Sequence, residues 1–266
     1  MRIDDPVYLL GDQYRNGDNL SARVELHRRF STNREAWFRW IFDRLSVPPV
    51  ADILEVGCGT GALWLENRAR IPAGWCVVLS DFSPGMLREA RGRLSGAGFA
   101  PWWCVADAQV LPFPDATFDA VVANHMLYHV PDRAPALTEI RRVLRPGGLL
   151  LAATAGRENL RELNELAARF APGTALDDAA ARFGLENGAA QLRPWFADVT
   201  CEDFPNALAI TEVEPVVAYL LSAPTAASVD STRLVALRDE LEGIIAREGA
   251  FRVTKTTGLF RCRAVV

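Results

Sequence analysis

The segment from residue 53 to residue 61 reads Ile-Leu-Glu-Val-Gly-Cys-Gly-Thr-Gly, an apolar run followed by three alternating glycines. The apolar run is typical of a buried parallel strand that carries Glu55 at its end. A helix is predicted to begin near Ala62, with the free N–H groups of its first turn facing the hollow at the strand end. A residue without a Cβ atom lets a ligand approach the backbone closely. The turn has three such residues, Gly57, Gly59 and Gly61, with Cys58 between the first two. The segment therefore predicts a strand–turn–helix unit that holds a nucleotide-like molecule.

Two classes of nucleotide cofactor are compatible with these glycines. Gly57, Gly59 and Ala62 also satisfy the looser pattern of dinucleotide-binding proteins, which includes the nicotinamide-dependent oxidoreductases. Glu55 lies two residues before the first glycine and argues against a pyrophosphate, because both groups are negatively charged. Its carboxylate favours instead the ammonium group of an amino-acid-like ligand, contacted directly or through water.

Three further apolar runs along the chain each end at a polar residue. Alternation of such runs with helical segments predicts a parallel sheet with helices on both faces. Ligands of such sheets bind at the carboxyl ends of the strands, so the polar side chains are expected to surround one ligand. The runs and their polar residues are 75–81 with Asp81, 102–106 with Asp107, and 118–123 with Asn124.

These polar residues suit the parts of an adenosyl group. Asp81 is the candidate acceptor for hydrogen bonds from both ribose hydroxyls. Phe82 and Met86 follow it, and a flat or polarizable side chain there could cover one face of an adenine. The Asp107 carboxylate could accept from the exocyclic amine, while the Ala108 N–H donates to a ring nitrogen.

Four motifs together resemble the class I S-adenosylmethionine-dependent methyltransferases, and among them the small-molecule enzymes of the quinone-biosynthesis type. The motifs lie at residues 55–61, 80–87, 106–119 and 144–148, and their order and spacing match the family over residues 30–155. The resemblance implies that S-adenosyl-L-methionine is the cofactor. It implies contacts of the methionyl part with Gly57, Gly59 and Gly61, of the ribose with Asp81, of the adenine with Asp107 and Ala108, and of the sulfonium end with Asn124 and His125.

The resemblance and the alternation of elements predict an α/β fold. A Rossmann-like, doubly wound, seven-stranded and mostly parallel sheet is expected, with an antiparallel edge strand at the C-terminus over residues 259–265. The chain is expected to be one methyltransferase domain over residues 1–266, with N-terminal helices in which residues 32–35 form a capping box. The resemblance implies that the segment with Tyr14, further upstream, folds over the cofactor, although Tyr14 could instead pack on the domain. The expected parts are an N-terminal helical arm, a cofactor-binding core, a helical cap insertion over the cleft and a C-terminal part of the core, at residues 1–47, 48–156, 157–196 and 197–266.

Two of the three histidines lie just after the fourth strand. In the resembling family that loop borders the methyl group, and histidine is the natural base at neutral pH for an acceptor that must lose a proton. His129 is the first candidate and His125 the second, although either could instead hydrogen-bond a neighbouring loop and shape the cleft. No cluster of carboxylates remains for a metal ion, so we expect activity to survive a chelator.

Composition restricts the partners and the location. The net charge of −4 and the absence of a basic cluster argue against a nucleic-acid partner. The five cysteines lack paired spacing, which argues against a disulfide framework. No apolar stretch approaches membrane-spanning length and the first residues do not read as a signal peptide, so no membrane partner and a cytoplasmic location are expected. The expected partner is a small-molecule acceptor, and a homodimer is compatible with the sequence.

Two other functions are weighed beside methyl transfer. A non-catalytic protein that binds S-adenosylmethionine and stabilises or regulates a partner would carry the same glycine turn. A nicotinamide-dependent oxidoreductase is disfavoured by Glu55 and by the loop at Asp107. Turnover of an acceptor separates the first alternative from an enzyme, and binding of NADH identifies the second.

Overall fold

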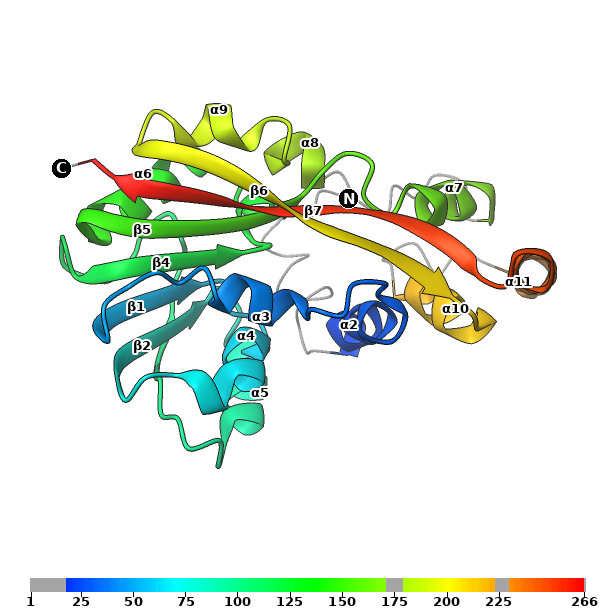
Figure 1. Cartoon of the computed structure of the whole chain (residues 1–266), viewed down its shortest axis with the longest axis horizontal. Helices are drawn as coiled ribbons and strands as arrows, with labels where there is room; N and C mark the ends of the chain where they lie inside the picture. Colours follow the sequence, from blue (N-terminus) through cyan, green and yellow to red (C-terminus); the bar gives the residue numbers. More distant parts are fainter. Residues whose placement is uncertain (1–17, 171–178, 223–229, 266) are drawn as a thin grey trace.

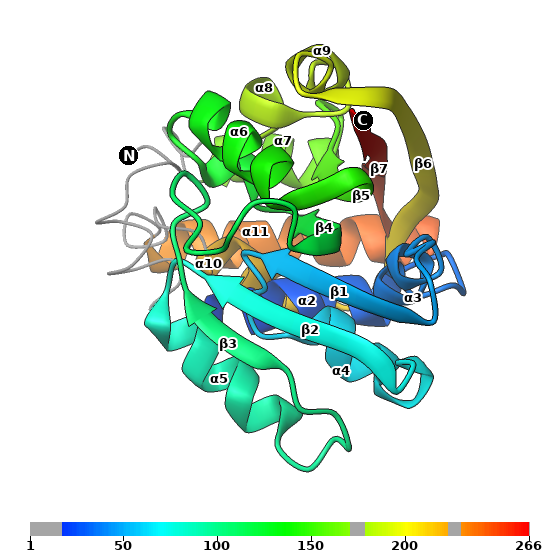
Figure 2. The ribbon, with the colours of Figure 1, turned by 90° about the vertical axis from the view of Figure 1, so that its left-hand side faces the viewer.

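The structure is a computed structural model that describes residues 18–170, 179–222 and 230–265. Its centre is a seven-stranded sheet in the order β3-β2-β1-β4-β5-β7-β6 (Figures 1 and 2). The first five strands pair in parallel, whereas β7 pairs antiparallel with both of its neighbours. In chain order the strands are β1 (Val50–Val56), β2 (Gly74–Asp81), β3 (Trp102–Val105), β4 (Phe118–Asn124), β5 (Leu144–Ala155), β6 (Phe196–Ile210) and β7 (Phe251–Ala264).

Helices cover both faces of the sheet, as the alternation predicts. Apolar side chains of α3, α4 and α5 pack with strand residues such as Ile53 and Val122 in one core. Those of α6, α8 and α9 pack with the residues in between, such as Leu54 and Val121, in a second core on the other face. The helices are α3 (Trp37–Phe42), α4 (Ala62–Asn67), α5 (Pro84–Leu94), α6 (Arg133–Val143), α8 (Ala179–Phe183) and α9 (Gly188–Leu192).

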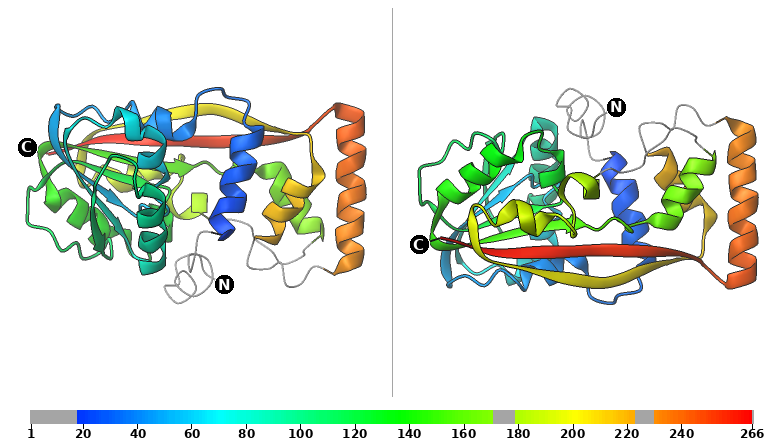
Figure 3. Two further views of the ribbon diagram at one scale, coloured as in Figure 1. Left: turned by 90° about the horizontal axis from the view of Figure 1, so that it is seen from below. Right: turned by 90° about the horizontal axis from the view of Figure 1, so that it is seen from above.

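A third hydrophobic core lies away from the parallel strands. The long strands β6 and β7 extend past the rest of the sheet as a two-stranded ribbon, and four helices pack on its far part (Figure 3). Leu26, Leu163, Leu241 and Val253 are among the buried side chains of this core. The helices, which together we call the outer lobe, are α2 (Asp18–Phe30), α7 (Arg161–Phe170), α10 (Val213–Leu221) and α11 (Ser231–Glu248).

Side-chain caps start several of these helices where the sequence places capping residues. Ser83 Oγ accepts from the Met86 N–H at 3.3 Å and is followed by proline at the first position of α5. Asp132 Oδ1 accepts from the Ala134 N–H at 3.1 Å at the start of α6. Both helices therefore begin at the residues that the sequence indicates.

The predicted capping box over residues 32–35 is wrong. α3 starts later and has no side-chain cap. The Thr32 N–H instead donates to the Ala207 carbonyl of β6 at 2.9 Å, and the Asn33 N–H donates to Asn206 Oδ1 at 3.1 Å. Contacts with a strand far away in the chain thus take the polar groups that a local cap would use.

The C-terminal strand is antiparallel, as predicted, but it is not the edge of the sheet. β7 begins at Phe251 rather than near residue 259, and it lies between β5 and β6. β6 is the edge strand, because it pairs only with β7, from Phe196 to Ile210. A pattern of alternating side chains does not reveal which of two neighbouring strands lies outside.

The stretch expected to be one helical insertion, residues 157–196, is divided between two places. α7 belongs to the outer lobe, whereas α8 and α9 lie on the sheet. The ring of Phe183 in α8 lies 5.8 Å from that of Phe260 in β7, and Thr154 Oγ1 donates to the Phe183 carbonyl at 2.6 Å. Among the helices of the described ranges, none has the length and apolar character needed to cross a membrane.

Candidate functional site

The polar residues that follow the parallel strands lie at one edge of the sheet. β1 pairs in parallel with β2 on one side and β4 on the other, and β2 pairs in parallel with β3. The Ala106 N–H donates to the Asp81 carbonyl at 3.1 Å, which ties the loop after β3 to the end of β2. The four strand ends are therefore adjacent, at the carboxyl edge where sheets of this kind bind ligands.

The glycine turn after β1 has a left-handed backbone at all three glycines. The φ angle is 68° at Gly57, 53° at Gly59 and 71° at Gly61, a left-handed region that favours glycine. The Gly59 N–H donates to Asp81 Oδ2 at 2.8 Å, so the turn is fastened to the end of β2. α4 begins at Ala62, directly after the turn, as predicted.

Two of these glycines are required by packing inside the protein. A Cβ atom at Gly57 would lie 2.8 Å from Met126 Cβ, and one at Gly61 would lie 3.0 Å from Leu94 Cδ1. The close approach that the sequence suggests for a ligand is thus made, at these two positions, by the loop after β4 and by α5. Gly59 differs from these two glycines, because its N–H donates a hydrogen bond to Asp81.

Asp81, the predicted ribose ligand, holds two loops together. Its Oδ1 accepts from the Ser83 N–H at 2.8 Å, and its Oδ2 accepts from the Gly59 N–H. Burial raises the pKa of the Asp81 carboxyl, and these two hydrogen bonds oppose the rise. Since each carboxylate oxygen can accept more than one hydrogen bond, both keep capacity for a ribose hydroxyl. Its ribose contact stays a prediction.

Glu55 is more deeply enclosed than its expected place at the strand end suggests. The residue is 2 % exposed, and its Oε2 accepts from Trp64 Nε1 of α4 at 2.6 Å. Burial raises the pKa of Glu55 to about 8; the Trp64 hydrogen bond lowers it, and the nearby Asp81 charge raises it. Burial, with the charges of Asp81 and Glu55, likewise raises the pKa of the Cys58 thiol. Glu55, Cys58 and Asp81 therefore lie within electrostatic reach of one another.

The residues predicted to hold the adenine differ in their exposure. Phe82 is 37 % exposed and available to a planar ligand, whereas Met86 is 1 % exposed and packed within the protein. The Asp107 carboxylate accepts from both N–H groups of Gln109, the backbone one at 2.9 Å. Ala108 is buried. Their contacts with an adenine stay predictions.

The loop after β4 carries both candidate histidines. His125 has a left-handed backbone with φ of 54°, and its N–H donates to the Ala153 carbonyl at 3.1 Å. Burial, together with the positive charges of Lys255 and His129, lowers the pKa of His125 to about 3. An imidazole of that pKa stays neutral at physiological pH and takes up a proton poorly. His129 lies in the η3 turn (Leu127–His129), its ring 4.5 Å from that of Tyr128.

Two neighbours of this loop were missed by reasoning from the sequence. The Trp37 ring of α3 lies 5.3 Å from the His125 ring, and Lys255 of β7 acts on the His125 pKa through its charge. Trp37 lies outside the motifs that indicate the site in the sequence. The available signal for Lys255 was its rarity, because it is the only lysine among 29 lysine and arginine residues. Tyr14 lies outside the described residues, and His27, the third histidine of the sequence, lies in α2.

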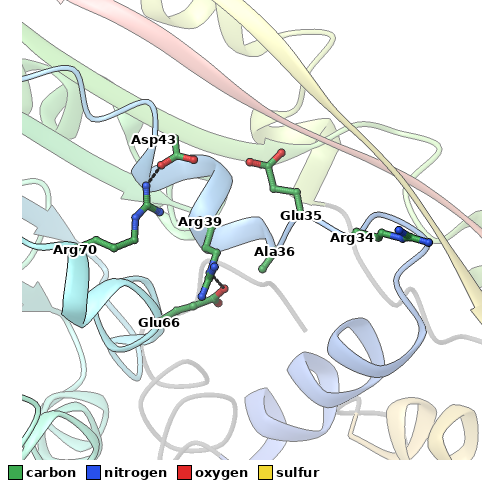
Figure 4. A pocket seen from close by; sticks show the side chains of 7 residues that line it. All are labelled: Arg34, Glu35, Ala36, Arg39, Asp43, Glu66 and Arg70. Carbon is green, nitrogen blue, oxygen red and sulfur yellow. Dashed lines mark hydrogen bonds and ion pairs between the residues drawn. The ribbon is translucent and has the colours of Figure 1, made fainter.

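A separate groove opens beside α3 and α4 (Figure 4). Its volume is about 640 Å³, and its charges are largely paired, Arg39 with Glu66 at 3.7 Å and Arg70 with Asp43. None of the residues at the carboxyl ends of the strands lines it. Its seven lining residues are Arg34, Glu35, Ala36, Arg39, Asp43, Glu66 and Arg70. Within the part of the chain that the structure describes, no three His, Cys, Asp or Glu side chains are grouped as metal ligands.

The sequence profile of the methyltransferase domain family matches residues 54–152. Among curated proteins, the chain is 35% identical over 133 residues to the ubiquinone/menaquinone biosynthesis C-methyltransferase UbiE of Desulfotalea psychrophila, covering 49% of this chain and 53% of that protein. It is 34% identical over 125 residues to the demethylmenaquinone methyltransferase of Symbiobacterium thermophilum, covering 46% and 50%. The chain thus spans about half the length of the curated relatives that it matches.

Solved structures of the same fold cover most of the chain. The (4+2)-cyclase SpnF has a TM-score of 0.62 at 18% identity, over 94% of this chain and 94% of that one. The phosphoethanolamine N-methyltransferase 2 of Haemonchus contortus, solved in complex with S-adenosyl-L-methionine, has a TM-score of 0.59 at 17% identity, over 100% of this chain and 60% of that one. The chain therefore shares its overall fold with these two proteins. A cyclase among its neighbours illustrates that the fold alone does not determine the reaction.

Proposed function

We propose that this chain, whose residues 54–152 form a methyltransferase domain of the class I S-adenosylmethionine-dependent type, transfers the methyl group of S-adenosyl-L-methionine to a small molecule. The observation that carries the proposal is the arrangement at the strand ends. Glu55 and Asp81 lie within electrostatic reach, the glycine turn is fastened to Asp81, and the Asp107 loop is tied to the same strand end. Three acidic side chains and a glycine turn therefore border one edge of the sheet.

The residues at this edge fit the cofactor in charge and in hydrogen-bonding capacity. Asp81 would accept from the ribose hydroxyls, and Asp107 with Ala108 would hold the adenine edge beside the exposed ring of Phe82. Glu55 would ionise opposite the ammonium of the methionyl part, because an adjacent positive charge reverses the effect of burial. When bound, the cofactor supplies an electrophilic methyl group on a sulfonium. The chain then has to hold the acceptor in line with that methyl group and exclude water.

The two histidines take different proposed roles. His129 is the proposed proton acceptor for an acceptor molecule that loses a proton on methylation. His125, whose pKa is lowered to about 3, is proposed to remain neutral and to shape the wall between Trp37 and the methyl group. A substitution His129→Ala should lower turnover at least about 100-fold while leaving the affinity for S-adenosylhomocysteine unchanged. Equal turnover in the wild type and the variant would remove His129 from this role.

The proposed partner is a small-molecule acceptor met in the cytoplasm. A net charge of −4 provides no electrostatic attraction for nucleic acid, and no nucleic-acid partner is proposed. Activity is proposed to be independent of a divalent metal. Full loss of activity in a chelator, restored by magnesium, would contradict this part of the proposal.

Calorimetry with two ligands tests the cofactor directly. We expect the chain to bind S-adenosylhomocysteine and not NADH. Asp81→Asn should weaken that binding by about 1.5–3 kcal/mol for each charge-assisted hydrogen bond lost. The exposed Asp203→Asn is the matched control and should leave the affinity unchanged. Binding of NADH alone would overturn the proposal, and binding of S-adenosylhomocysteine without turnover of phenols, amines or acids would favour the non-catalytic alternative.

A further inference from the structure

Lys255 is the only lysine of a chain that otherwise uses arginine for its positive charges. It lies in the middle of β7, and residues that pair directly on neighbouring strands point to the same face of a sheet. Lys255 pairs with Asn206 of β6, and Thr257, two residues further, pairs with Phe204 of β6 and Ala155 of β5. Lys255 and Thr257 therefore belong to the same face as Phe204.

That face is the one covered by α3. The Phe204 ring lies 5.2 Å from the Trp37 ring, which in turn lies 5.3 Å from the His125 ring. Asn124, at the end of β4, pairs with Ala153, which belongs to the same core as Phe204. Lys255 therefore lies on the same face of the sheet as the residues at the end of β4, further towards the outer lobe.

The charge of Lys255 has no counter-charge in the described part of the chain. None of the hydrogen bonds and ion pairs there involves its amine, and its electrostatic neighbour His125 is also flanked by His129. Many arginines of the described ranges do have a carboxylate partner; Arg142, for example, pairs with Glu139 at 2.7 Å. Burial lowers the pKa of Lys255 to about 8, so much of the amine is still protonated at neutral pH.

Three polar groups close to this face of the sheet are buried without a partner. Thr257 is 4 % exposed, and its hydroxyl has no hydrogen bond within the described residues. The same holds for Trp37 Nε1 and for Asn124 Oδ1. A buried polar group without a partner costs free energy, so such groups mark a place where a ligand completes the hydrogen bonds. Lys255, Thr257 and Trp37 each present a donor, which suits an oxygen with negative charge, whereas the unpartnered Asn124 Oδ1 is an acceptor.

We propose that Lys255, with Thr257 and Trp37, binds an anionic oxygen of the methyl acceptor. The acceptor class is therefore an organic acid: a molecule with a carboxylate or with an ionised phenol or enol. This inference rests on the proposed methyltransferase function and adds the chemical class of its acceptor. Lys255 is a binding residue in this proposal, whereas His129 keeps the role of proton acceptor.

The test uses the chain saturated with S-adenosylhomocysteine and small aromatic probes near neutral pH. Benzoate represents a carboxylate, and phenol represents an acid that ionises only when the protein stabilises its anion. Benzamide is the neutral match to benzoate. We expect benzoate or phenol to bind more tightly than benzamide, and a red shift of the phenol absorption would identify the phenolate source.

Substitutions at and near Lys255 test whether its amine causes the preference for an anionic probe. Lys255→Met should weaken binding of the anionic probe at least about tenfold and leave benzamide unchanged, whereas Lys255→Arg should keep most of the affinity. Arg252→Met removes an exposed cation from the opposite face of β7 and should change binding less than about twofold. Thr257→Val is a second variant that keeps the charge and should weaken the anion severalfold.

The outcomes separate this inference from the proposed function. The affinity for S-adenosylhomocysteine should be equal in the wild type and Lys255→Met. The unfolding midpoint of the variant should not fall, because the amine that is removed is partly buried and has no counter-charge in the described part of the chain. Preference for benzamide, or equal binding of the anion by the wild type and Lys255→Met, would overturn the inference alone. Failure of the wild type to bind S-adenosylhomocysteine would overturn both proposals.

A signal from the single lysine gives a direct readout. Reductive methylation of amines with ¹³C-formaldehyde and cyanoborohydride labels one side chain, Lys255, besides the terminal amine. We expect the resonance of the labelled side chain to move on addition of benzoate or phenol and to stay in place with benzamide. Movement of no resonance in the presence of a bound anion would place the anion elsewhere and contradict the inference.

Discussion

Glu55 combines a buried carboxyl group with a proposed contact to a positively charged ligand. At 2 % exposure the ionised form is unfavourable, which is why the pKa rises to about 8. In the ligand-free chain the group is therefore mostly protonated at neutral pH. Its hydrogen bond from Trp64 is compatible with either protonation state, because the indole N–H needs only an acceptor.

The raised pKa predicts an unusual pH dependence of stability. Between the ordinary pKa of 4.5 and the folded pKa of about 8, the unfolded chain releases the Glu55 proton before the folded chain does. The unfolded state then binds fewer protons, so the free energy of unfolding falls as the pH rises through this window. Glu55→Gln removes the effect and should be more stable than the wild type at pH 8 by about 3–5 kcal/mol.

Urea unfolding of both proteins between pH 5 and pH 8 measures this difference. The exposed Glu242→Gln is the control and should follow the wild-type profile. Added S-adenosylhomocysteine should stabilise the wild type more than Glu55→Gln, since only the carboxyl can ionise opposite an ammonium. Parallel profiles of Glu55→Gln and wild type would contradict the buried neutral carboxyl.

A comparison of Gly57 with Gly96 separates the cost of a strained backbone from the cost of a steric contact inside the protein. Both have a left-handed φ, 68° and 74°, which an alanine adopts at a cost of about 1 kcal/mol. A Cβ atom at Gly57 would also lie 2.8 Å from Met126 Cβ, whereas one at Gly96 has no atom within 4 Å. Gly57→Ala should therefore lower the free energy of unfolding by about 1–3 kcal/mol more than Gly96→Ala. Urea unfolding compares them, and equal losses would mean that the contact with Met126 is easily relieved.

At the scale of elements, α3 depends on a strand far away in the chain. The helix has only six residues and no side-chain cap, too little for stability of its own. Its approach is fixed by Asn206 of β6, whose Oδ1 accepts from the Asn33 N–H at 3.1 Å and from Ser31 Oγ at 2.9 Å. The helix then carries Trp37 to His125. The wall of the proposed acceptor site is thus built by the edge strand as much as by α3.

Asn206→Ala should loosen this segment. The variant leaves the Asn33 N–H without its acceptor, so we expect a loss of about 1–3 kcal/mol and faster amide exchange over residues 31–42. Thr200→Val removes one exposed hydrogen bond at the other end of β6 and is the matched control. Amide exchange followed by mass spectrometry measures both. Unchanged exchange over residues 31–42 in Asn206→Ala would show that packing of Trp37 alone holds α3.

At the scale of the molecule, the sheet separates three hydrophobic cores. Two lie on the faces of the parallel strands, and the third lies in the outer lobe on the far part of the β6–β7 ribbon. The proposed cofactor residues border the first two cores, and Lys255 lies on β7 where the ribbon leaves them. The proposed acceptor site therefore lies between the cofactor-binding part and the outer lobe.

Substitution of a leucine by alanine in two of these cores should destabilise different parts of the molecule. Leu241 of α11 is 0 % exposed in the outer lobe, and Leu137 of α6 is 1 % exposed on the sheet. Each change to alanine should cost about 2–5 kcal/mol locally. Leu241→Ala should speed amide exchange mainly in the outer lobe and leave the affinity for S-adenosylhomocysteine within about twofold, whereas Leu137→Ala should speed exchange in β4 and β5. Equal exchange over the whole sheet in Leu241→Ala would mean that the three cores unfold as one unit.

Local sequence determined the elements whose causes lie within a few residues. The strand, glycine turn and helix from Val50 to Asn67 follow from apolar runs and from φ angles that glycine prefers. The starts of α5 and α6 follow from Ser83 and Asp132, since a cap needs only the next two or three residues. The order of polar residues at the strand ends also came from the sequence, because parallel strands must place their carboxyl ends together.

Only the tertiary structure decided how distant segments meet. It gave Glu55 a partner in Trp64, set Met126 against Gly57, drew residues 32–33 to β6 and placed Lys255 near His125. None of these contacts has a local signal, because each depends on how the packed faces of the sheet bring together residues far apart in the chain. Burial and the charge of neighbours, which set the pKa values of Glu55 and His125, arise from that packing and not from residue type.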